Sequence, residues 1–130
     1  MRNLDILVIY NGIRQFGIDC TEITRVISNI NEDKDTKFIK QFGKENSFFD
    51  IKYMSRQKPG NDINSFIIVK NEKGKEILVS VPEISNIINT GVKNILVIPE
   101  YLRKKQDPFF VWGFIDSDKT LISLITFMYF

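Results

Sequence analysis

Side chains able to do chemistry are few and scattered along this 130-residue chain. The sequence has no histidine, which excludes histidine general bases, Ser-His-Asp and Cys-His nucleophile systems, and histidine-ligated metals. Cys20 is the single cysteine, so neither an internal disulfide nor a cysteine-rich zinc site can form. Asp, Glu, Lys and Tyr remain, and we expect no catalytic site, no metal and no cofactor.

The remaining reactive-looking motifs have simpler structural explanations. Gly43-Lys44 and Gly74-Lys75 lack the upstream glycine and the following Ser or Thr of a phosphate-binding loop. Asp116 and Asp118 form a carboxylate pair, but their spacing fits the polar tip of a hairpin. No neighbouring residue marks Cys20 as an activated thiol, so we interpret it as a small core residue. The sequence therefore predicts a protein that is not an enzyme.

Composition predicts one compact, sheet-rich domain. A chain of 130 residues fits a single unit, and 18 basic against 16 acidic residues leave little long-range field for binding nucleic acid. The sequence has no alanine and many isoleucines, a bias that favours strands over helices. No stretch has the length and apolarity of a membrane span, and no signal-peptide pattern is found. We therefore expect a cytoplasmic protein without membrane insertion.

Turn signals predict four hairpins joined by short helical pieces. Asn11-Gly12 between two apolar runs is the strongest hairpin signal in the sequence. The predicted hairpins span residues 4–20, 37–53, 65–81 and 109–130. A short helix or turn is expected at 21–27, capped by a threonine, and another at 100–105. A short helix opened by a proline is expected at 83–88. The polar stretch 56–64 is the best candidate for a linker.

The chain contains an internal repeat. Residues 6–8 align with 67–69, 21–27 with 82–88 and 38–51 with 111–124, so pseudo-repeats cover roughly 1–60 and 61–130 of a single domain, 1–130. A unit of four or five strands cannot easily bury its apolar face alone, and small sheets curl to remove their edges. We predict two pseudo-equivalent small barrels that share one hydrophobic core. Chance similarity between β-hairpins is the alternative explanation.

Three segments carry a resemblance to a known family. Phe16-Gly17-Ile18-Asp19, Phe48-Phe49-Asp50-Ile51-Lys52 and Ile98-Pro99-Glu100-Tyr101 resemble the CheW family, the scaffold proteins of bacterial chemotaxis arrays. The resemblance covers nearly the whole chain. It implies a mainly β fold of two intertwined five-stranded barrels with short helices. It also implies a non-catalytic adaptor that bridges a CheA-type histidine kinase, through the kinase's regulatory domain, and the cytoplasmic tips of chemoreceptors.

The chain departs from the family where an interaction surface is expected. Lys40-Gln41-Phe42-Gly43 stands in place of the family's Asn-Leu-Arg-Gly, and only the glycine is kept. Arg25 replaces a frequent glutamate, and Pro82 replaces an aspartate. In the family these polar residues often form or support the interaction surface. Their replacement is therefore expected to affect coupling to receptors. The protein-binding candidates are Ile23, Thr24, Arg25, Lys40, Phe42 and Gly43.

Each of these candidates also has a structural interpretation. Phe42 is either an aromatic anchor exposed between the barrels or a core phenylalanine, and the preference of aromatic residues for cores favours the second. Arg25 is either an interface residue or a solvated surface charge. Phe109, Phe110 and Trp112 follow a basic run, which suggests either base stacking on single-stranded nucleic acid or a core-filling strand; the weak net charge favours the strand.

Three functions follow from these patterns. The first is an adaptor that couples a CheA-type kinase to chemoreceptors by docking alone. The second keeps the fold but serves another signalling complex, since the family's polar positions are lost. The third is an unrelated small β-barrel that binds single-stranded nucleic acid.

Overall fold

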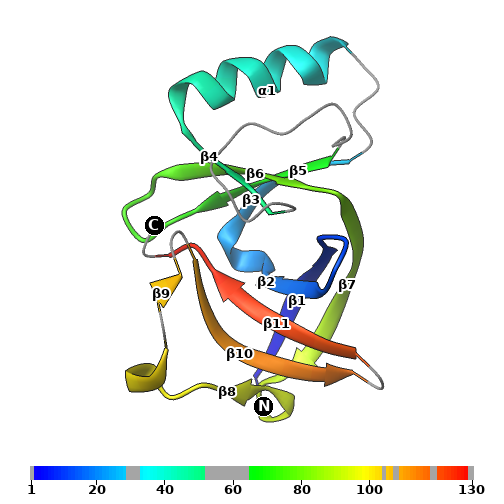
Figure 1. The fold of residues 1–130 in the computed structure, drawn as a ribbon, viewed down its shortest axis with the longest axis vertical. Helices are drawn as coiled ribbons and strands as arrows, with labels where there is room; N and C mark the ends of the chain where they lie inside the picture. Colours follow the sequence, from blue (N-terminus) through cyan, green and yellow to red (C-terminus); the bar gives the residue numbers. More distant parts are fainter. Residues whose placement is uncertain are drawn as a thin grey trace.

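The computed structural model describes residues 2–28, 33–51, 65–103, 105–106, 109–117 and 120–128. Two β-sheets face each other across a hydrophobic core, and one helix covers the outer side of the smaller sheet (Figure 1). The predicted mainly β fold is therefore confirmed.

Sheet A is the larger sheet and has seven strands. Its strand order is β7-β1-β2-β11-β10-β8, and β9 pairs separately with β10. Its strands are β1 (Asn3–Tyr10), β2 (Gln15–Asp19), β7 (Glu83–Gly91), β8 (Leu96–Val97), β9 (Lys105–Gln106), β10 (Phe109–Ser117) and β11 (Thr120–Thr126). The β2–β11 pairing is parallel and the others are antiparallel.

Sheet B has four strands in the order β3-β5-β6-β4. Its strands are β3 (Ile23–Ile27), β4 (Ser47–Asp50), β5 (Ser65–Lys70) and β6 (Glu76–Val81). Here β4 runs parallel to β6, while the other two pairings are antiparallel.

The two sheets exchange strands. After the β1–β2 hairpin of sheet A, β3 crosses to sheet B and pairs with β5. After the β5–β6 hairpin of sheet B, β7 crosses to sheet A and pairs with β1. Each crossing strand has a bulge, at Thr24 in β3 and at Ser85 in β7, and these two positions are aligned in the sequence comparison. Neither sheet closes into a barrel through hydrogen bonds of the described residues, so the two five-stranded barrels stay a prediction.

Two asparagines shape the predicted hairpin turns in the same way. Asn11 Oδ1 accepts backbone hydrogen bonds from Ile13 and Arg14, each at 2.9 Å. Asn71 Oδ1 accepts from Lys73 and Lys75, also at 2.9 Å. Such asparagine-centred turns satisfy backbone N–H groups that a ladder cannot reach. The β1–β2 and β5–β6 hairpins are confirmed, as is the β10–β11 hairpin.

Two segments predicted as helices are strands. Residues 21–27 form the end of a 3-10 helix, η1 (Cys20–Glu22), followed by β3, and residues 83–88 belong to β7. Thr21 was expected to cap a helix; instead Asp19 Oδ1 accepts from Thr21 N at 3.0 Å and ends β2. Both segments are dense in isoleucine, valine and threonine, whose branched side chains fit a strand better than a helix. The sequence prediction gave the caps too much weight.

Residues 37–42 were predicted as a strand and are a helix. Helix α1 (Asp33–Glu45) occupies the place of the first strand of the second predicted hairpin, and β4 follows it. Phe38, Ile39 and Phe42 recur at helical spacing and pack on the outer face of sheet B. Phe42 therefore lies on a helix and not at the end of a strand. The predicted linker, 56–64, lies outside the described residues.

Sheet B is buried on both faces. Along β5, Phe66 and Ile68 face α1, whereas Ile67 and Val69 face sheet A. The cluster between the sheets contains Leu7, Ile9, Phe16, Ile18, Phe49, Ile51, Ile67, Val69, Ile77, Val79, Val81, Phe109, Ile125 and Phe127. A separate cluster lies under the curl of sheet A and contains Ile6, Val8, Ile95, Ile115, Ile122 and Leu124.

A half-buried carboxyl ties η1 to the end of β11. Thr126 Oγ1 donates a hydrogen bond to Glu22 Oε1 and accepts one from Met128 N at 3.2 Å. Partial burial raises the pKa of Glu22 above its ordinary value; the hydrogen bond from Thr126 opposes this, and the charge of Asp19 adds to it. The charged form of Glu22 is therefore held less well in the folded protein than in the unfolded chain.

Glu22→Gln is expected to stabilise the protein at neutral pH. A carboxyl whose pKa is higher in the folded state stabilises it fully below the unfolded pKa, and this contribution is lost as pH rises through the folded pKa. Glutamine keeps an oxygen that accepts from Thr126, so a gain of up to about 1 kcal/mol at pH 7 is expected. Urea denaturation from about pH 4 to pH 7 tests this. Glu72→Gln, at an exposed turn, is the control. Parallel pH profiles for wild type and Glu22→Gln would contradict it.

Candidate protein-interaction surfaces

Strand β3 and helix α1 bring most of the predicted binding residues together. The Arg25 guanidinium carbon lies 4.2 Å from the centre of the Phe38 ring, a cation–π contact between β3 and α1. Arg25 is exposed, so the edge of its guanidinium remains accessible to a carboxylate. The structure thus gives Arg25 both a packing partner and a solvent-facing side.

Ile23 and Thr24 have structural roles. Ile23 is half-buried and packs against the core between the sheets. Thr24 is the bulge residue of β3, and its Oγ1 lies 3.2 Å from the carbonyl oxygen of Ile68 and 3.1 Å from Glu76 Oε2. These contacts hold the edge strand on β5 and β6. Ile23 is therefore mainly a packing residue, whereas Thr24 is exposed and its hydroxyl is engaged with Ile68 and Glu76.

The three α1 candidates differ in exposure. Lys40 is exposed, whereas Phe42 and Gly43 are half-buried. The rings of Phe42 and Phe38 have centroids 5.7 Å apart, and Phe42 packs against the cluster of Ile27, Phe66, Ile68 and Leu78. Phe42 thus anchors α1 to sheet B, and Lys40 is the α1 candidate best placed to meet a partner.

Gly43→Ala is expected to raise the free energy of unfolding by about 0.5–1 kcal/mol, because glycine in a helix costs about that much relative to alanine. An added Cβ would meet only Leu78 Cδ2, at 3.9 Å, which is ordinary contact. Urea denaturation measures the gain. As a control, Gly74→Ala should destabilise instead, since Gly74 has a φ of 81°. A loss of stability in Gly43→Ala would show that this position needs glycine for another reason.

The aromatic cluster near the C-terminal hairpin belongs to the interior. Phe109 is buried between the sheets, within 6.4 Å of Phe16 and 5.9 Å of Phe49 between ring centroids, and Phe110 and Trp112 are half-buried. Phe109 therefore fills the core, as the second interpretation of this cluster predicted.

The described residues show no centre for metal or thiol chemistry. No group of three or more Cys, Asp or Glu side chains among them is arranged to hold a metal. Partial burial raises the pKa of the Cys20 thiol, and the charges of Asp5 and Asp19 raise it further, so the thiol keeps its proton. No helix in this part of the chain has the length and apolarity needed to cross a bilayer.

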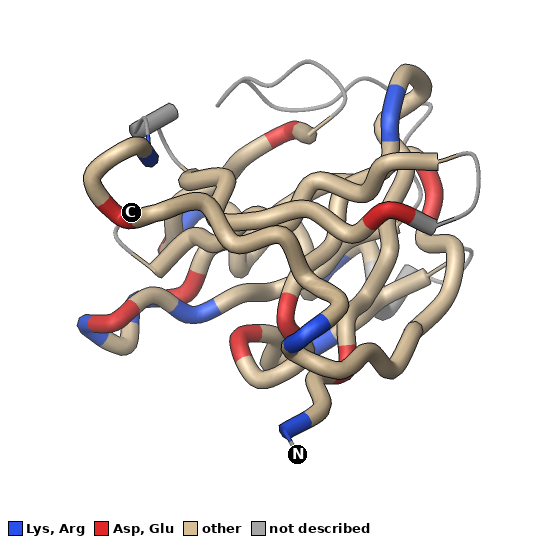
Figure 2. The backbone as a smooth tube through the Cα atoms, turned by 90° about the horizontal axis from the view of Figure 1, so that it is seen from below, with Lys and Arg blue, Asp and Glu red and all other residues tan. Residues whose placement is uncertain are grey.

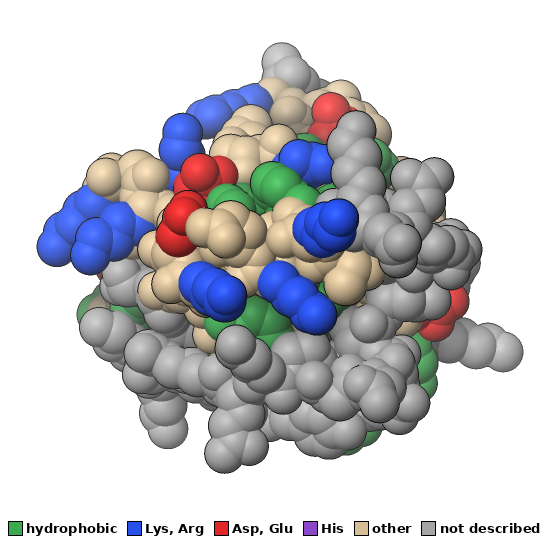
Figure 3. Space-filling model, turned by 90° about the horizontal axis from the view of Figure 1, so that it is seen from above, with side chains coloured by type: hydrophobic (Ala, Val, Ile, Leu, Met, Phe, Trp, Pro, Cys, Tyr) green, Lys and Arg blue, Asp and Glu red, His purple; other side chains and the backbone are tan. Residues whose placement is uncertain are grey.

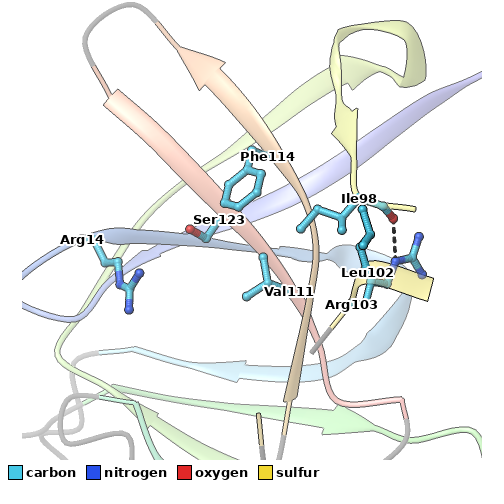
Figure 4. A pocket seen from close by; sticks show the side chains of 7 residues that line it. All are labelled: Arg14, Ile98, Leu102, Arg103, Val111, Phe114 and Ser123. Atoms are coloured by element: carbon cyan, nitrogen blue, oxygen red, sulfur yellow. Dashed lines mark hydrogen bonds between the residues drawn. The ribbon is translucent and has the colours of Figure 1, made fainter. Parts of the chain in front are cut away.

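A trough on sheet A was missed in the sequence. It encloses about 280 Å³ and is lined by Arg14, Ile98, Leu102, Arg103, Val111, Phe114 and Ser123. Figure 4 shows Arg14 at one end and Arg103 at the other, with apolar side chains between them. Arg103 Nε donates to the carbonyl oxygen of Ile98 at 2.8 Å, which leaves its terminal nitrogens to other acceptors. An apolar segment flanked by carboxylates fits this arrangement.

The segment 96–102, which we call the apolar band, exposes Leu96, Val97, Tyr101 and Leu102, and Leu102 also lines the trough. Tyr101 is 85% exposed and Leu102 59% exposed. Four large apolar residues within seven positions, all in solvent, are typical of a protein-interaction site. The sequence predicted a short strand here, followed by a short basic helix or turn. The sequence pattern does not show which of these side chains remain exposed to solvent.

The two crossing strands each expose one apolar side chain. Val26 on β3 is 46% exposed, and Ile87 on β7 is 62% exposed. These residues occupy aligned positions in the two segments 21–27 and 82–88. Strand β7 is also an edge of sheet A. The exposed faces of β3 and β7 are therefore a further candidate surface.

Comparison with solved structures identifies the fold. A crystal structure of the scaffolding protein TtCheW from Thermoanaerobacter tengcongensis superposes with a TM-score of 0.66, over 98% of this chain and 92% of that chain. The chain has a CheW-like fold. Sequence identity between the two is 18%. No family model matches the chain, and no curated protein matches it in sequence.

The CheW-like fold here carries its interaction candidates on opposite parts of the structure. Arg25 and Lys40 lie with sheet B and α1, and the trough and apolar band lie on sheet A. Elsewhere the charges are mixed: Figure 2 shows basic and acidic residues interspersed along the backbone. A molecule with separate candidate surfaces on its two sheets has the geometry to bind two partners at once.

Proposed function

We propose that this protein is a non-catalytic adaptor that joins a CheA-type histidine kinase to chemoreceptors. The observation that carries the proposal is the similarity to a CheW scaffolding protein along almost the whole length of both chains. The exposed apolar residues Tyr101 and Leu102 support a docking role.

The adaptor works by docking alone. The kinase's regulatory domain, which shares the family fold, packs on the apolar band and trough of sheet A. Burying Tyr101 and Leu102 supplies the apolar contact, and the arginines at the two ends select a partner that offers carboxylates. The receptor's helix pair lies in the groove between the two barrels that the resemblance implies, near the exposed faces of β3 and β7.

Binding to the regulatory domain of a CheA-type kinase tests the proposal. Wild type is expected to bind it with a dissociation constant of about 50 µM or tighter. Leu102→Asp should weaken binding at least about tenfold, because it places a charge in a desolvated contact. Val92→Asp is the matched control: Val92 is also an exposed apolar residue in a 3-10 helix, η2 (Val92–Asn94), outside the trough. Failure of the wild type to bind any such domain would overturn the proposal.

A second candidate function keeps the CheW-like fold and changes the partner. The observation that favours it is α1, which carries Lys40-Gln41-Phe42-Gly43 where the family has Asn-Leu-Arg-Gly. A divergent adaptor would bind the kinase domain but leave kinase activity uncoupled from receptors. Kinase assays with reconstituted receptor arrays separate the two functions.

The third candidate function is binding of single-stranded nucleic acid. A nucleic-acid-binding barrel would bind oligo-dT with affinity that falls steeply with salt. Because Phe109 is buried and the net charge is +2, we expect no such binding.

A further inference from the structure

Helix α1 carries a basic stripe on the side that faces away from the protein. The stripe consists of Lys37, Lys40 and Lys44, which are three and four residues apart and are all exposed. Residues at these spacings line up along one side of a helix. At 1.5 Å per residue the stripe is about 10 Å long. Figure 3, which looks down on the α1 side of the molecule, shows several basic side chains there.

The stripe is held rigidly. Phe38, Ile39 and Phe42 occupy the opposite side of α1 and pack against sheet B. The cation–π contact of Arg25 with Phe38 fixes the flank of the helix to β3 and adds a fourth exposed cation beside it. Because the helix cannot roll without breaking this packing, the lysines are presented in a fixed direction.

The stripe is unfavourable for the isolated protein. Like charges three and four residues apart cost about 0.2–0.5 kcal/mol per pair. None of the three lysines is paired with a carboxylate among the side chains that the structure describes. Glu45, which directly follows Lys44 in the sequence, accepts a hydrogen bond from Gln41 at 2.6 Å instead.

We propose that the basic stripe of α1, with Arg25, is a docking site for an acidic segment of a partner protein. Charge complementarity selects carboxylates. A nucleic-acid site of useful affinity neutralises roughly 6–10 phosphates, more than four cations can reach. A surface helix binds an anionic membrane firmly when it also inserts an apolar face between the lipids, and the apolar face of α1 is already buried on sheet B. The inference goes beyond the proposed function, since it does not require the partner to be a kinase or a receptor.

Poly-L-glutamate is the probe that tests this inference. At low ionic strength it is expected to shift the backbone amide signals of α1 and of Arg25 in NMR spectra. The charge-reversal variant K37E/K40E/K44E should bind it at least about tenfold more weakly, which corresponds to three exposed ion pairs lost. The neutral variant K37Q/K40Q/K44Q should fall between the two, and it guards against misfolding caused by charge reversal.

A matched control distinguishes the effect of where the lysines lie from the effect of the protein's net charge. Lys70, Lys73 and Lys75 are also exposed, but they lie in and beside the β5–β6 turn, close in sequence to Glu72 and Glu76. K70E/K73E/K75E makes the same change in net charge and should retain most of the binding. Equal weakening by the two triple variants would overturn the inference, as would tighter binding of oligo-dT or phosphatidylserine vesicles to the same stripe. Kinase-domain binding is measured separately, so its failure would count against the proposed function alone.

Discussion

Replacing Gly17 by valine is expected to lower the free energy of unfolding by about 3 kcal/mol. Gly17 lies in β2, between β1 and β11 in the middle of sheet A. A Cβ at this position would lie 2.7 Å from Ile6 Cγ2 and 2.8 Å from Leu124 Cδ2. Both contacted side chains are fully buried under the curl of sheet A, so neither can move without disturbing its neighbours.

Urea denaturation of Gly17→Val and Gly17→Ala measures this effect. Alanine should cost about 1–3 kcal/mol, since its single methyl group still meets the same two side chains. The double variant Gly17→Ala with Leu124→Val should recover part of the loss, because it removes volume from the crowded side. If Gly17→Ala is as stable as the wild type, the close approach of β1, β2 and β11 is not as tight as described.

Phe109→Ala is expected to lower the free energy of unfolding by about 3–5 kcal/mol. The Phe109 ring sits between the sheets and contacts Phe16 of β2, Phe49 of β4 and Phe127 after β11. Ring centroids in this group are 5.9 to 6.4 Å apart, in edge-on or tilted arrangements that add to simple burial. Its removal leaves a cavity where sheets A and B meet.

Chemical denaturation with Phe109→Leu and Phe110→Ala as comparisons isolates this contribution. Leucine keeps most of the apolar volume and should cost much less than alanine. Phe110 is the next residue and is only half-buried, so its removal should cost less than that of Phe109. A loss below about 1 kcal/mol for Phe109→Ala would mean that the sheets do not depend on this aromatic group.

The candidate binding surfaces of sheet A depend on the residues that stabilise the sheet. Gly17 and Phe109 hold the framework of sheet A, and the trough and apolar band lie on that same sheet. Variants of the framework should therefore lose binding only as far as they lose folded protein. Leu102→Asp should lose binding without losing stability, because Leu102 is largely in solvent.

Local sequence was sufficient where a short-range interaction decides the structure. The β1–β2 hairpin follows from Asn11-Gly12, because the asparagine side chain and a glycine with φ of 97° make the turn without help from distant residues. The apolar runs within 65–70 and 76–81, separated by the turn residues Glu72-Lys73-Gly74, likewise identified β5 and β6. The absence of histidine and of a second cysteine, which residue type alone shows, excludes histidine-dependent catalysis and an internal disulfide.

The sequence also contained a signal that was given the wrong weight. Phe38, Ile39 and Phe42 have helical spacing, but the turn residues 43–46 favoured a hairpin, and the alignment of 38–51 with 111–124 agreed with it. In the structure the second of these segments contains β10, and the first contains most of α1. The repeat alignment thus places different secondary structures at matching positions. Phe42, one of the predicted binding residues, was therefore expected at the end of a strand but lies on the side of α1 that packs against sheet B.

What the sequence determined by itself was three of the four predicted hairpins, the strand-rich character and the lack of histidine and disulfide chemistry, all of which depend on residue type and near neighbours. Only the tertiary structure decided that β3 pairs with β5 and β7 with β1, so that each sheet contains strands from both halves of the chain. It also decided which apolar residues stay in solvent. Ile67 and Leu102 are equally apolar in sequence, but the first is covered by a sheet and the second is not. Burial depends on contacts between residues far apart in the chain, and no local pattern records them.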